Sequence, residues 1–479
     1  MLFPDVSEME AYIQGQAMRG HFFFGLRVWS ALVYKVLTMC QSTTEGTEME
    51  LHNSPNLPFL SDMRHRAESL LSENLMPFWA RHAWDREYGG FLTRLDRRGV
   101  RLDDSEKVLM MQVRMIYSLS AAHRHGLRDR GYLELASRGF EYLIHNFWDT
   151  VNGGFYFSVN RDGSPRSTRK NTDFHAYALT GMSEYYLASQ QREALDWACR
   201  VFDLLVEKAA DRDTGFIEDF DGNAWPALNA EQMGLGERTG IKTIDMHTNM
   251  LEGMIYLARA SGRQRHRDAL GALLDLICLQ GIHVGHGCTV TAFDADWHPV
   301  GDAAGRMTTS YGLNVELAWL IWEAMDVLNI QEALYDRCAL GLIDHALTYG
   351  FDRERGGIAA NGPVMGSVLA ATDLGEARLY KSWWAQAEFM NALCRAYSKT
   401  GRRDYFDALV KTFDWIYRYQ VDHECGDWYQ DTRWDTGEPL VTDKGREFKT
   451  AFHAGRALIQ LCDALRQWLD RGKPADTES

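Results

Sequence analysis

Apolar residues recur at helical spacing along almost the whole chain. In the segment 61–82, for example, Leu70, Leu71, Leu75, Phe78 and Trp79 fall on one face of a helix. The same spacing predicts twelve helices, at 61–82, 106–124, 131–147, 172–188, 191–210, 242–261, 264–281, 309–328, 330–349, 380–400, 402–420 and 447–470. Long aromatic and acidic segments follow the odd-numbered helices, whereas the even-numbered ones turn quickly into the next helix. A unit of helix, hairpin and helix therefore repeats at a period of roughly 60–70 residues.

The long connections share a motif. An acidic residue is followed by a glycine step, then by aromatic or β-branched residues and a second Asp/Gly turn. Clear copies begin at Asp85, Asp149, Asp211 and Asp352, and degenerate copies begin at Cys288 and Cys425. Each unit leaves an apolar face that only its neighbours can cover. The sequence therefore predicts six helical hairpins closed into a ring, with function on the edge that carries the long loops.

The ends of the chain differ from this repeat. Residues 1–55 hold an apolar stretch interrupted by Arg27 and Lys35, followed by a polar linker. We expect 1–55 to be a peripheral or poorly ordered extension, 56–472 to be the catalytic domain, and 473–479 to be a flexible tail.

The even-numbered helices carry polar residues at positions where the pattern predicts a core. These residues are Lys107, Gln112, Arg114, Asp173, His175, Asp245, His247, Asn249, Glu252, Asn314, Glu316, Gln386, Glu388, His453 and Arg456. Burying an unpaired polar group costs about 1–3 kcal/mol on mutational scales. Polar groups at similar places in six helices therefore predict a water-filled central pocket.

Composition excludes several classes of function. The net charge of -15 argues against a nucleic-acid partner, and no uncharged apolar run is long enough to predict a membrane span. The eight cysteines form no CxxC pair, which favours reduced thiols in a cytoplasmic protein. The sequence HVGHG at His283 lacks further ligands at metal-site spacing, and no phosphate or dinucleotide loop is present. We therefore expect neither a metal nor a cofactor.

With these residues in view, the chain resembles the N-acylglucosamine 2-epimerase superfamily, which includes cellobiose 2-epimerases and mannose isomerases. The resemblance covers roughly residues 58–470. It is carried by WDREYGGFLTRLDRRG, the Gln112-x-Arg114 pair, HAYALTGMSEYY, HTNMLEG, SYGLNVELAW, KSWWAQAE and FHAGRA. The resemblance implies an all-α (α/α)6 barrel and cofactor-free proton transfer at carbon 2 of an aldose or ketose. The expected partner is a small-molecule carbohydrate, with a homodimer left open.

The family pattern places three histidines in the site, and this chain keeps one of them. His453 matches the third, but Asn249 stands at the first position and Leu313 at the second. Epimerisation needs one group that takes a proton from carbon 2 and another that returns it on the opposite face. Carboxylates that remain for this task are Glu316, Glu252, Glu388 and Asp245.

The candidate residues follow from the motifs and the resemblance. The candidate catalytic residues are His453, Glu316, Glu388 and His247. The candidate substrate-binding residues are Arg114, Asn249, Glu252, Trp383, Trp384, His175, Tyr117 and Arg456. A fixed Arg114 could stabilise an enediolate oxygen. The apolar face of a sugar could pack on one tryptophan of the adjacent pair, since neighbours on a helix point about 100° apart.

Three functions remain open on these residues. The first is a sugar 2-epimerase or aldose–ketose isomerase, with His453 as one proton carrier and a pocket carboxylate, His175 or His247 as the other. The second is a glycoside hydrolase that uses two carboxylates of the same scaffold. The third is a sugar-binding protein without catalysis, which keeps Trp383 and Trp384 as stacking surfaces.

Overall fold

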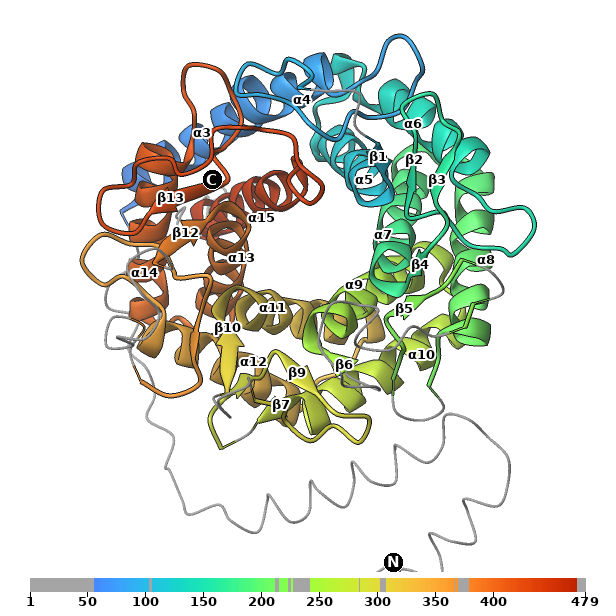
Figure 1. Ribbon diagram of the computed structural model, residues 1–479. Helices are drawn as coiled ribbons and strands as arrows, with labels where there is room; N and C mark the ends of the chain where they lie inside the picture. Colours follow the sequence, from blue (N-terminus) through green and yellow to red (C-terminus); the bar gives the residue numbers. More distant parts are fainter. Residues whose placement is uncertain are drawn as a thin grey trace, which may run out of the picture.

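Two concentric rings of helices form the molecule (Figure 1). The computed structural model describes residues 56–102, 106–211, 215–222, 225–226, 242–283, 285–301, 307–366, 368 and 379–471. All twelve predicted helices occur within these ranges, and the all-α (α/α)6 barrel is confirmed. The predicted extension 1–55 and tail 473–479 lie outside the described residues.

The inner ring consists of the even-numbered helices of the sequence pattern. They are α5 (Leu109–His125), α7 (Thr172–Ser189), α9 (Ile244–Ser261), α11 (Tyr311–Leu328), α13 (Trp383–Thr400) and α15 (Phe452–Arg471). Each packs against the next, and α15 packs against α5 to close the ring.

The outer ring consists of the odd-numbered helices. They are α3 (Leu57–Ser69) continued by η1 (Leu70–Leu75) and α4 (Met76–His82), α6 (Tyr132–Asn146), α8 (Arg192–Lys208), α10 (Gln264–Leu276) continued by η3 (Ile277–Gly281), α12 (Ala333–Tyr349), and α14 (Arg403–Trp415) continued by η7 (Ile416–Gln420). A short 3-10 turn, η2 (Arg128–Arg130), joins α5 to α6.

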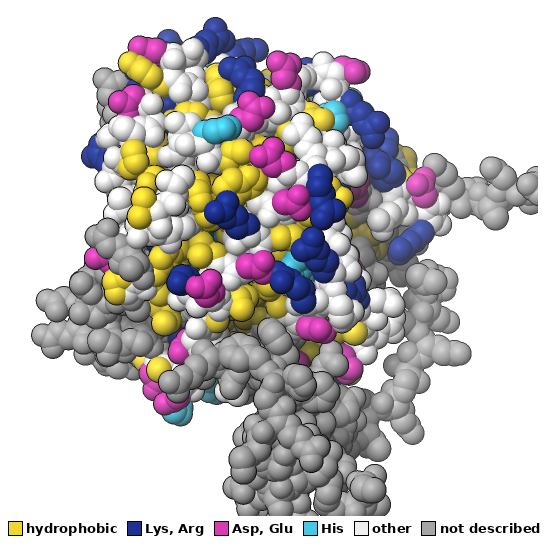
Figure 2. Space-filling model, turned by 90° about the vertical axis from the view of Figure 1, so that its right-hand side faces the viewer, with side chains coloured by type: hydrophobic (Ala, Val, Ile, Leu, Met, Phe, Trp, Pro, Cys, Tyr) yellow, Lys and Arg dark blue, Asp and Glu magenta, His cyan; other side chains and the backbone are white. Residues whose placement is uncertain are grey.

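Burial separates the two rings. In α5 every residue from Leu109 to Ala122 is buried, because the outer helices cover one side and the neighbouring inner helices cover the others. In α8 the buried residues form one stripe that includes Ala194, Ala198 and Val201. Figure 2 shows an outer face of the barrel, where acidic and basic side chains alternate among apolar ones.

Two glycines let the inner helices approach closely. A Cβ at Gly181 of α7 would lie 2.6 Å from the carbonyl oxygen of Val113 in α5. A Cβ at Gly253 of α9 would lie 2.6 Å from the carbonyl oxygen of Ala176 in α7. Since neither backbone can yield, only glycine fits at these two positions.

Short antiparallel strands occupy the connections that lead into the inner helices. They are β1 (Lys107–Val108), β2 (Ser158–Val159), β3 (Pro165–Ser167), β4 (Lys170–Asn171), β5 (Asp219–Phe220), β6 (Lys242–Thr243), β7 (Ile282–His283), β8 (Cys288–Thr289), β9 (Ala292–Phe293), β10 (Thr308–Ser310), β11 (Asn361–Pro363), β12 (Tyr380–Ser382) and β13 (Asp431–Arg433). They pair as β1-β2-β3, β4-β5, β6-β9, β7-β8, β10-β11 and β12-β13. Several of them immediately precede an inner helix, so the pairing fixes where that helix begins.

Two copies of the hairpin motif are placed differently from the prediction. The hairpin after α10 is the β7–β8 pair, in which His283 pairs with Cys288. The segment from Cys288 continues into a second hairpin that closes at the Phe293–Pro299 bridge. The last hairpin closes between Val421 and Trp428, so it begins before Cys425.

Buried lysines fasten the hairpins to the barrel. The ammonium groups of Lys107, Lys170, Lys242 and Lys381 lie 3.1, 3.0, 2.9 and 2.9 Å from the aspartates that open the motif, Asp85, Asp149, Asp211 and Asp352. Each of these lysines lies two residues before an inner helix. Each Lys–Asp pair therefore ties a loop to the start of the helix that follows it.

A second anchor lies five residues after each of these lysines. At this position Gln112, His175, His247 and Gln386 accept a hydrogen bond from the backbone N–H of Phe91, Phe155, Phe216 and Ile358. In the fourth unit Thr309 stands in the lysine position, and Asn314 accepts from the N–H of Thr289. Five inner helices thus satisfy a hairpin N–H with a side chain from the same place in the repeat, which accounts for part of their polarity.

None of the described helices is both long and apolar enough to cross a membrane. The seven described cysteines, which exclude Cys40, form no disulfide.

Candidate active site

A cavity of about 1090 Å³ opens at the hairpin edge of the inner ring. Its helical lining comes from the first two turns of the inner helices, and the remainder comes from the strands and loops before them. The positive ends of the helix dipoles therefore point toward this cavity, which favours negative charge in a bound molecule. The predicted polar pocket is present at the predicted edge.

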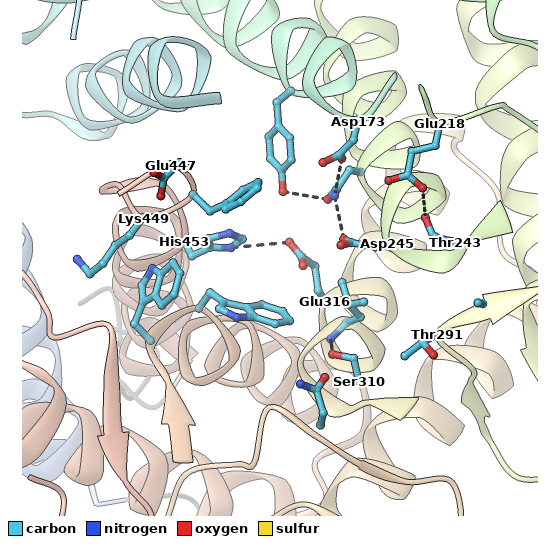
Figure 3. Close-up of a pocket in the computed structure, with 18 of the residues that line it drawn as sticks. Asp173, Glu218, Thr243, Asp245, Thr291, Ser310, Glu316, Glu447, Lys449 and His453 are labelled. Carbon is cyan, nitrogen blue, oxygen red and sulfur yellow. Dashed lines mark hydrogen bonds and ion pairs between the residues drawn. The ribbon is translucent and has the colours of Figure 1, made fainter. Parts of the chain in front are cut away.

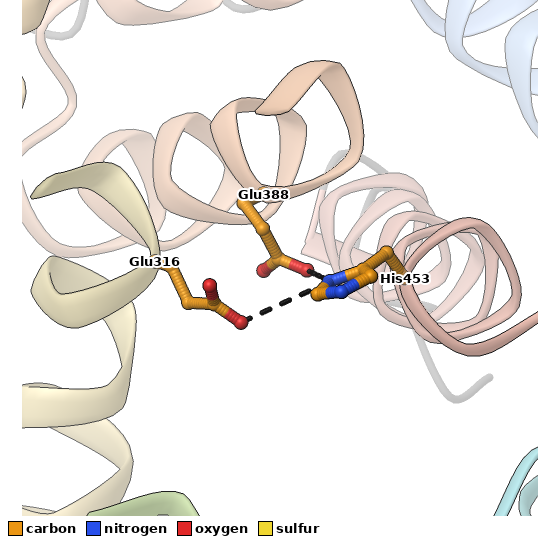
Figure 4. A group of neighbouring side chains, drawn as sticks. All are labelled: Glu316, Glu388 and His453. Atoms are coloured by element: carbon orange, nitrogen blue, oxygen red, sulfur yellow. Dashed lines mark hydrogen bonds and ion pairs between the residues drawn. The ribbon is translucent and has the colours of Figure 1, made fainter. Parts of the chain in front are cut away.

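His453 is one catalytic candidate that reaches the cavity. It stands near the start of α15, where its Nδ1–H donates to Oε1 of Glu388 at 2.6 Å. Its Nε2 makes no hydrogen bond to any described residue, and the side chain lines the cavity (Figures 3 and 4). Burial, together with Arg114 and Arg456, lowers the pKa of His453 to about 4, although Glu388 opposes the shift. The ring is therefore neutral at pH 7, with the lone pair of Nε2 available as a base.

Three glutamates share one guanidinium behind His453. Arg456 donates to Glu316 at 2.9 Å and to Glu388 at 2.8 Å, and it also bonds Glu252. Burial would raise the pKa of Glu388, but Arg456 and His453 lower it to about 2, so Glu388 is ionised. Burial and the negative charge of Glu388 raise the pKa of Glu316 well above its usual value, which favours its protonated form. Glu316 is therefore placed to donate a proton, and Glu388 to orient the histidine.

The same network disfavours a metal ion at this place. Glu316, Glu388 and His453 have ligand atoms close enough to hold an ion, as do Asp422, Glu424 and Cys425, alone among the described side chains. In the first group, however, Oε1 of both glutamates already accepts from Arg456. In the second group, Lys444 and Arg97 contact Asp422. A cation would have to displace a buried positive side chain in either case.

The opposite wall of the cavity is acidic. Asn249 donates through Nδ2 to Asp173 at 2.7 Å and to Asp245 at 3.1 Å, and its Oδ1 accepts from the hydroxyl of Tyr177 at 2.9 Å. Figure 3 shows Asp173, Asp245 and Glu218 on the far side of Glu316 from His453. Enclosure by the barrel raises the pKa of Asp173 and of Asp245, and the charge of Asp245 raises that of Asp173 further.

Glu218 borders this acidic wall from the hairpin side. The hydroxyl of Thr243 donates to Oε2 of Glu218 at 2.8 Å. Burial, with Asp219 and Asp245, raises the pKa of Glu218 to about 7. The wall therefore holds several carboxyl groups for which the protonated form is accessible near neutral pH.

A cation and two aromatic rings complete the lining. The Arg114 guanidinium lies 4.2 Å from the Tyr177 ring centre, and its Nη1 donates to the carbonyl of Phe448 at 2.6 Å. Its Nε is buried and has no hydrogen-bond partner. Trp383 and Trp384 both line the cavity, with ring centres 6.4 and 6.0 Å from that of His453. The prediction that only one of the pair reaches the site is wrong, because Trp383 is the first residue of α13 and follows extended backbone.

The structure corrects the assignment of two histidines. Nδ1–H of His175 donates to the carbonyl of Asn171, and Nε2 accepts from the N–H of Phe155. His247 makes the same two bonds, to Thr243 and from Phe216. Neither ring lines the cavity. Both nitrogens of each ring serve the hairpin anchor, so the structure does not place His247 or His175 at the cavity, where the predicted catalytic and substrate-binding roles require them.

Four further candidates lie behind the cavity wall. Glu388, Glu252 and Arg456 belong to the buried network and do not line the cavity. The hydroxyl of Tyr117 lies 2.6 Å from that of Tyr256, deeper in the barrel. We predicted that these four residues act on or bind the substrate, but none of them lines the cavity. Of the candidates, Arg114, Asn249, Glu316, Trp383, Trp384 and His453 line the cavity.

The candidate list omitted Tyr177, Asp173 and Asp245, which line the cavity, although the repeat in the sequence points to them. When the units are aligned on Lys107, Lys170, Lys242, Thr309 and Lys381, the seventh residue after each is Arg114, Tyr177, Asn249, Glu316 and Glu388. Four of these line the cavity, and the fifth contacts His453. Asp173, Asp245 and Trp384 share the third position in the same alignment. Three and seven residues lie on one face of a helix, whereas five does not.

Comparison with known proteins now adds to this geometry. A family model described as N-acylglucosamine 2-epimerase (GlcNAc 2-epimerase) matches residues 89–456, which is more than half of the chain. The chain belongs to the N-acylglucosamine 2-epimerase family.

Two relatives of this chain are named as cellobiose 2-epimerases. The cellobiose 2-epimerase of Bacteroides fragilis is 26% identical over 403 residues, covering 83% of this chain and 98% of that protein. The solved cellobiose 2-epimerase from Spirochaeta thermophila is 27% identical, with a TM-score of 0.76 and coverage of 86% and 98%. A solved D-mannose isomerase, 18% identical, has a TM-score of 0.71 over 87% of this chain and all of that one, and it supports the fold. The N-acylglucosamine 2-epimerase resemblance is confirmed, and it places the chain among isomerase-class enzymes of sugars.

Proposed function

We propose that this chain interconverts sugars by moving the proton on carbon 2, with His453 as one of the groups that carry it. The observation that supports this most is the state of the His453 ring. Its Nδ1–H is held by the ionised Glu388, while its Nε2 is unbound and lines the cavity. A neutral imidazole fixed in this way can take a proton from carbon and give it back.

The surroundings of His453 suit the charge that develops after proton removal. Loss of the carbon 2 proton from an open-chain aldose, or of a carbon 1 proton from the corresponding ketose, gives an enediolate, whose oxygens become negative. Arg114 offers a buried Nε without a partner, and Glu316 offers a carboxyl group with a raised pKa. Donors fixed in advance stabilise such an oxygen without reorganising during the reaction. Because the carbonyl of the sugar itself activates the carbon 2 proton, this step calls for no cofactor.

Three features of the site make a carboxylate-pair glycosidase a weaker interpretation. That interpretation used Glu316 and Glu388 on the two sides of a glycosidic bond. Glu388 does not line the cavity, and both carboxylates bond the same guanidinium. Glu388 also has a pKa of about 2, so it cannot act as the general acid.

Hydrogen exchange tests the proposal directly. The protein is incubated in heavy water with cellobiose, mannose or N-acetylglucosamine, and carbon 2 of the recovered sugars is followed by nuclear magnetic resonance. We expect deuterium at carbon 2 of at least one probe, together with its 2-epimer or the corresponding ketose.

The variant His453→Gln tests the role of the histidine, and Glu184→Gln serves as its control. Glu184 is a buried carboxyl group of α7 that pairs with Arg124 outside the cavity. Conversion of a probe into its 2-epimer or ketose should disappear in His453→Gln and persist in Glu184→Gln. Absence of exchange with every probe, or normal conversion in His453→Gln, would show that the proposal is wrong.

A further inference from the structure

The order of the inner helices places two ionisable groups on opposite sides of the cavity. Following the ring from α15, the neighbours are α5 and α7 in one direction and α13 and α11 in the other, so that α9 lies directly opposite (Figure 1). His453 is the second residue of α15, and Asp245 is the second residue of α9. Both line the cavity, so they approach a molecule on the barrel axis from opposite sides.

Asp245 does not stand alone on its side. The amide of Asn249, four residues further along α9, donates to Asp245 and to Asp173 of α7. Tyr177 donates to the amide oxygen, which fixes the direction in which the Nδ2 hydrogens point. Two carboxyl groups held by one amide repel each other when both are ionised, so the arrangement favours one shared proton.

This pair occupies the place that the missing histidine would fill. In the family pattern the first histidine corresponds to Asn249, and here the asparagine can only hydrogen-bond. Asn249 instead presents Asp245, whose side chain is exposed to the cavity, whereas Asp173 is only partly exposed. Leu313, at the second histidine position, also lines the cavity and has no proton to give.

We infer that Asp245, held with Asp173 by the Asn249 amide, is the second proton carrier and acts on the face of the sugar opposite His453. This inference rests on the proposed function. It makes the reaction a two-faced epimerisation, in which Asp245 is the catalytic residue while Asp173 and Asn249 are positioning residues.

The proton balance is complete within these groups and water. Nε2 of His453 takes the carbon 2 proton from one face, and the bonding electrons form the enediolate. The carboxyl pair then gives its shared proton, through Asp245, to carbon 2 from the other face, and the carbonyl at carbon 1 is restored. His453 loses its proton to water, and the carboxyl pair regains one from water. Starting from the other epimer, ionised Asp245 is the base and protonated His453 is the acid.

Two other carboxyl groups of the lining fit this role less well. Oε1 of Glu316 lies 3.8 Å from Nδ1 of His453, so Glu316 belongs to the histidine side of the site. Glu218 lies on the loop between α8 and α9 and already accepts a hydrogen bond from the hydroxyl of Thr243. Asp245 combines a place opposite His453 with a free path to the cavity.

The test measures exchange separately from each of two epimers. Each member of an epimeric pair, for example cellobiose and its 2-epimer, is incubated alone in heavy water with the wild type, His453→Gln, Asp245→Asn or Asp173→Asn. We expect Asp245→Asn to exchange carbon 2 of one epimer only, and His453→Gln to exchange the other epimer only. Interconversion should fall about 10²- to 10⁴-fold in both variants, the usual range for loss of a general acid or base.

Two further measurements separate catalysis from structure. Asp173→Asn should reduce exchange of both epimers less than Asp245→Asn reduces its own, because the Asn249 amide still holds Asp245. Difference infrared spectra at neutral pH should show a protonated carboxyl band of the Asp173–Asp245 pair that changes in Asp245→Asn and stays unchanged in the control Glu184→Gln.

The outcomes distinguish the inference from the proposed function. Failure of the wild type to exchange carbon 2 of any probe removes both. Exchange in the wild type that Asp245→Asn leaves unchanged, or reduces equally for the two epimers, overturns the inference alone.

Discussion

Buried neutral histidines occur in two regions of this barrel, beneath the hairpins and at the cavity, and they make different contacts in the two. His175 and His247 lie beneath the hairpins, and His453 lies at the cavity. Burial lowers the pKa of each to about 4, and each donates through Nδ1–H to a fixed oxygen. The difference is what Nε2 meets, a backbone N–H in the first region and open cavity in the second. Burial and a shifted pKa therefore do not distinguish the two regions, whereas the unoccupied nitrogen of His453 does, and it supports the role proposed for this residue.

Helix register explains why the two regions differ. His175 and His247 stand five residues after a buried lysine, at the position that Gln112 and Gln386 fill in other units. An amide oxygen and an imidazole nitrogen serve there equally as acceptors. His453 has no such equivalent, because its ring lines the cavity and its Nε2 meets no N–H of the described hairpins. The anchor position therefore tolerates any residue that supplies an acceptor, whereas the proposed role of His453 requires a group that can take up a proton.

The strongest way to break this comparison is to substitute both kinds of histidine by glutamine. His453→Gln should reduce conversion of one epimer into the other by about 10³-fold, since a neutral amide accepts no proton from carbon. His247→Gln should retain exchange within about threefold, because the glutamine oxygen can accept the N–H of Phe216 as Gln112 accepts that of Phe91. Rates are measured per folded molecule by nuclear magnetic resonance. A large loss of exchange in a folded His247→Gln protein would contradict the division into two regions.

Removal of an anchor lysine should affect stability and leave the chemistry intact. Lys381→Met leaves the buried carboxylate of Asp352 without its partner at 2.9 Å. We expect the free energy of unfolding to fall by about 3–5 kcal/mol, as is usual when one member of a buried pair is removed. Urea unfolding measures this loss, and Lys381→Met/Asp352→Asn should recover part of it. A loss below about 1 kcal/mol would mean that the pair does not fasten the hairpin.

A substitution of Glu388 tests the hydrogen bond that orients His453. Glu388→Gln keeps an oxygen for Nδ1–H but removes the negative charge that favours the imidazolium form after proton transfer. We expect exchange to fall by about 10- to 100-fold, less than for loss of the base itself. The pH profile distinguishes this from damage to the fold, because the pKa of His453 should fall further without Glu388. An unchanged profile would mean that Glu388 is only part of the packing.

The smallest expected effect concerns the pH dependence of stability. His175 and His247 have folded pKa values of about 4, below the unfolded value near 6.5. Their contribution to stability is therefore complete above pH 6.5 and is lost as the pH falls toward 4. When the pH falls from 7 to 5.5, each of these two histidines should lower the free energy of unfolding by about 1 kcal/mol. His175→Gln/His247→Gln should show a correspondingly flatter profile in urea unfolding than the wild type, and an equal slope in the two proteins would refute the assignment.

Much of the architecture could be predicted from the sequence because periodicity reports burial directly. All twelve helices, the polar pocket and the edge on which it opens followed from apolar spacing and the repeated motif. His453, Arg114 and Glu316 were predicted from motifs and do line the cavity.

Which polar residues reach the cavity could not be predicted in this way, because it depends on the helix face that each residue occupies. His175 and Asp173 lie two residues apart on one helix, and only the register relative to Lys170 shows that one faces a hairpin and the other the cavity. The partnership of Asp173 with Asn249 joins residues 76 positions apart, so local sequence carried no sign of it. Tyr117 was assigned to the site by its helical spacing from Arg114, but it lies deeper along the axis, against Tyr256.

The cluster around Arg456 has a consequence for how the protein responds to its medium. One guanidinium meets three carboxyl groups, and the pKa values of Glu252 and Glu316 are raised mainly by burial. In the unfolded chain at neutral pH all three acids are ionised. Protonation of Glu316 during folding therefore takes a hydrogen ion from the buffer, so this part of the heat of folding depends on the buffer's own heat of ionisation. Alkaline solution opposes that uptake, which makes this cluster a source of instability at high pH even though acid weakens the histidine anchors.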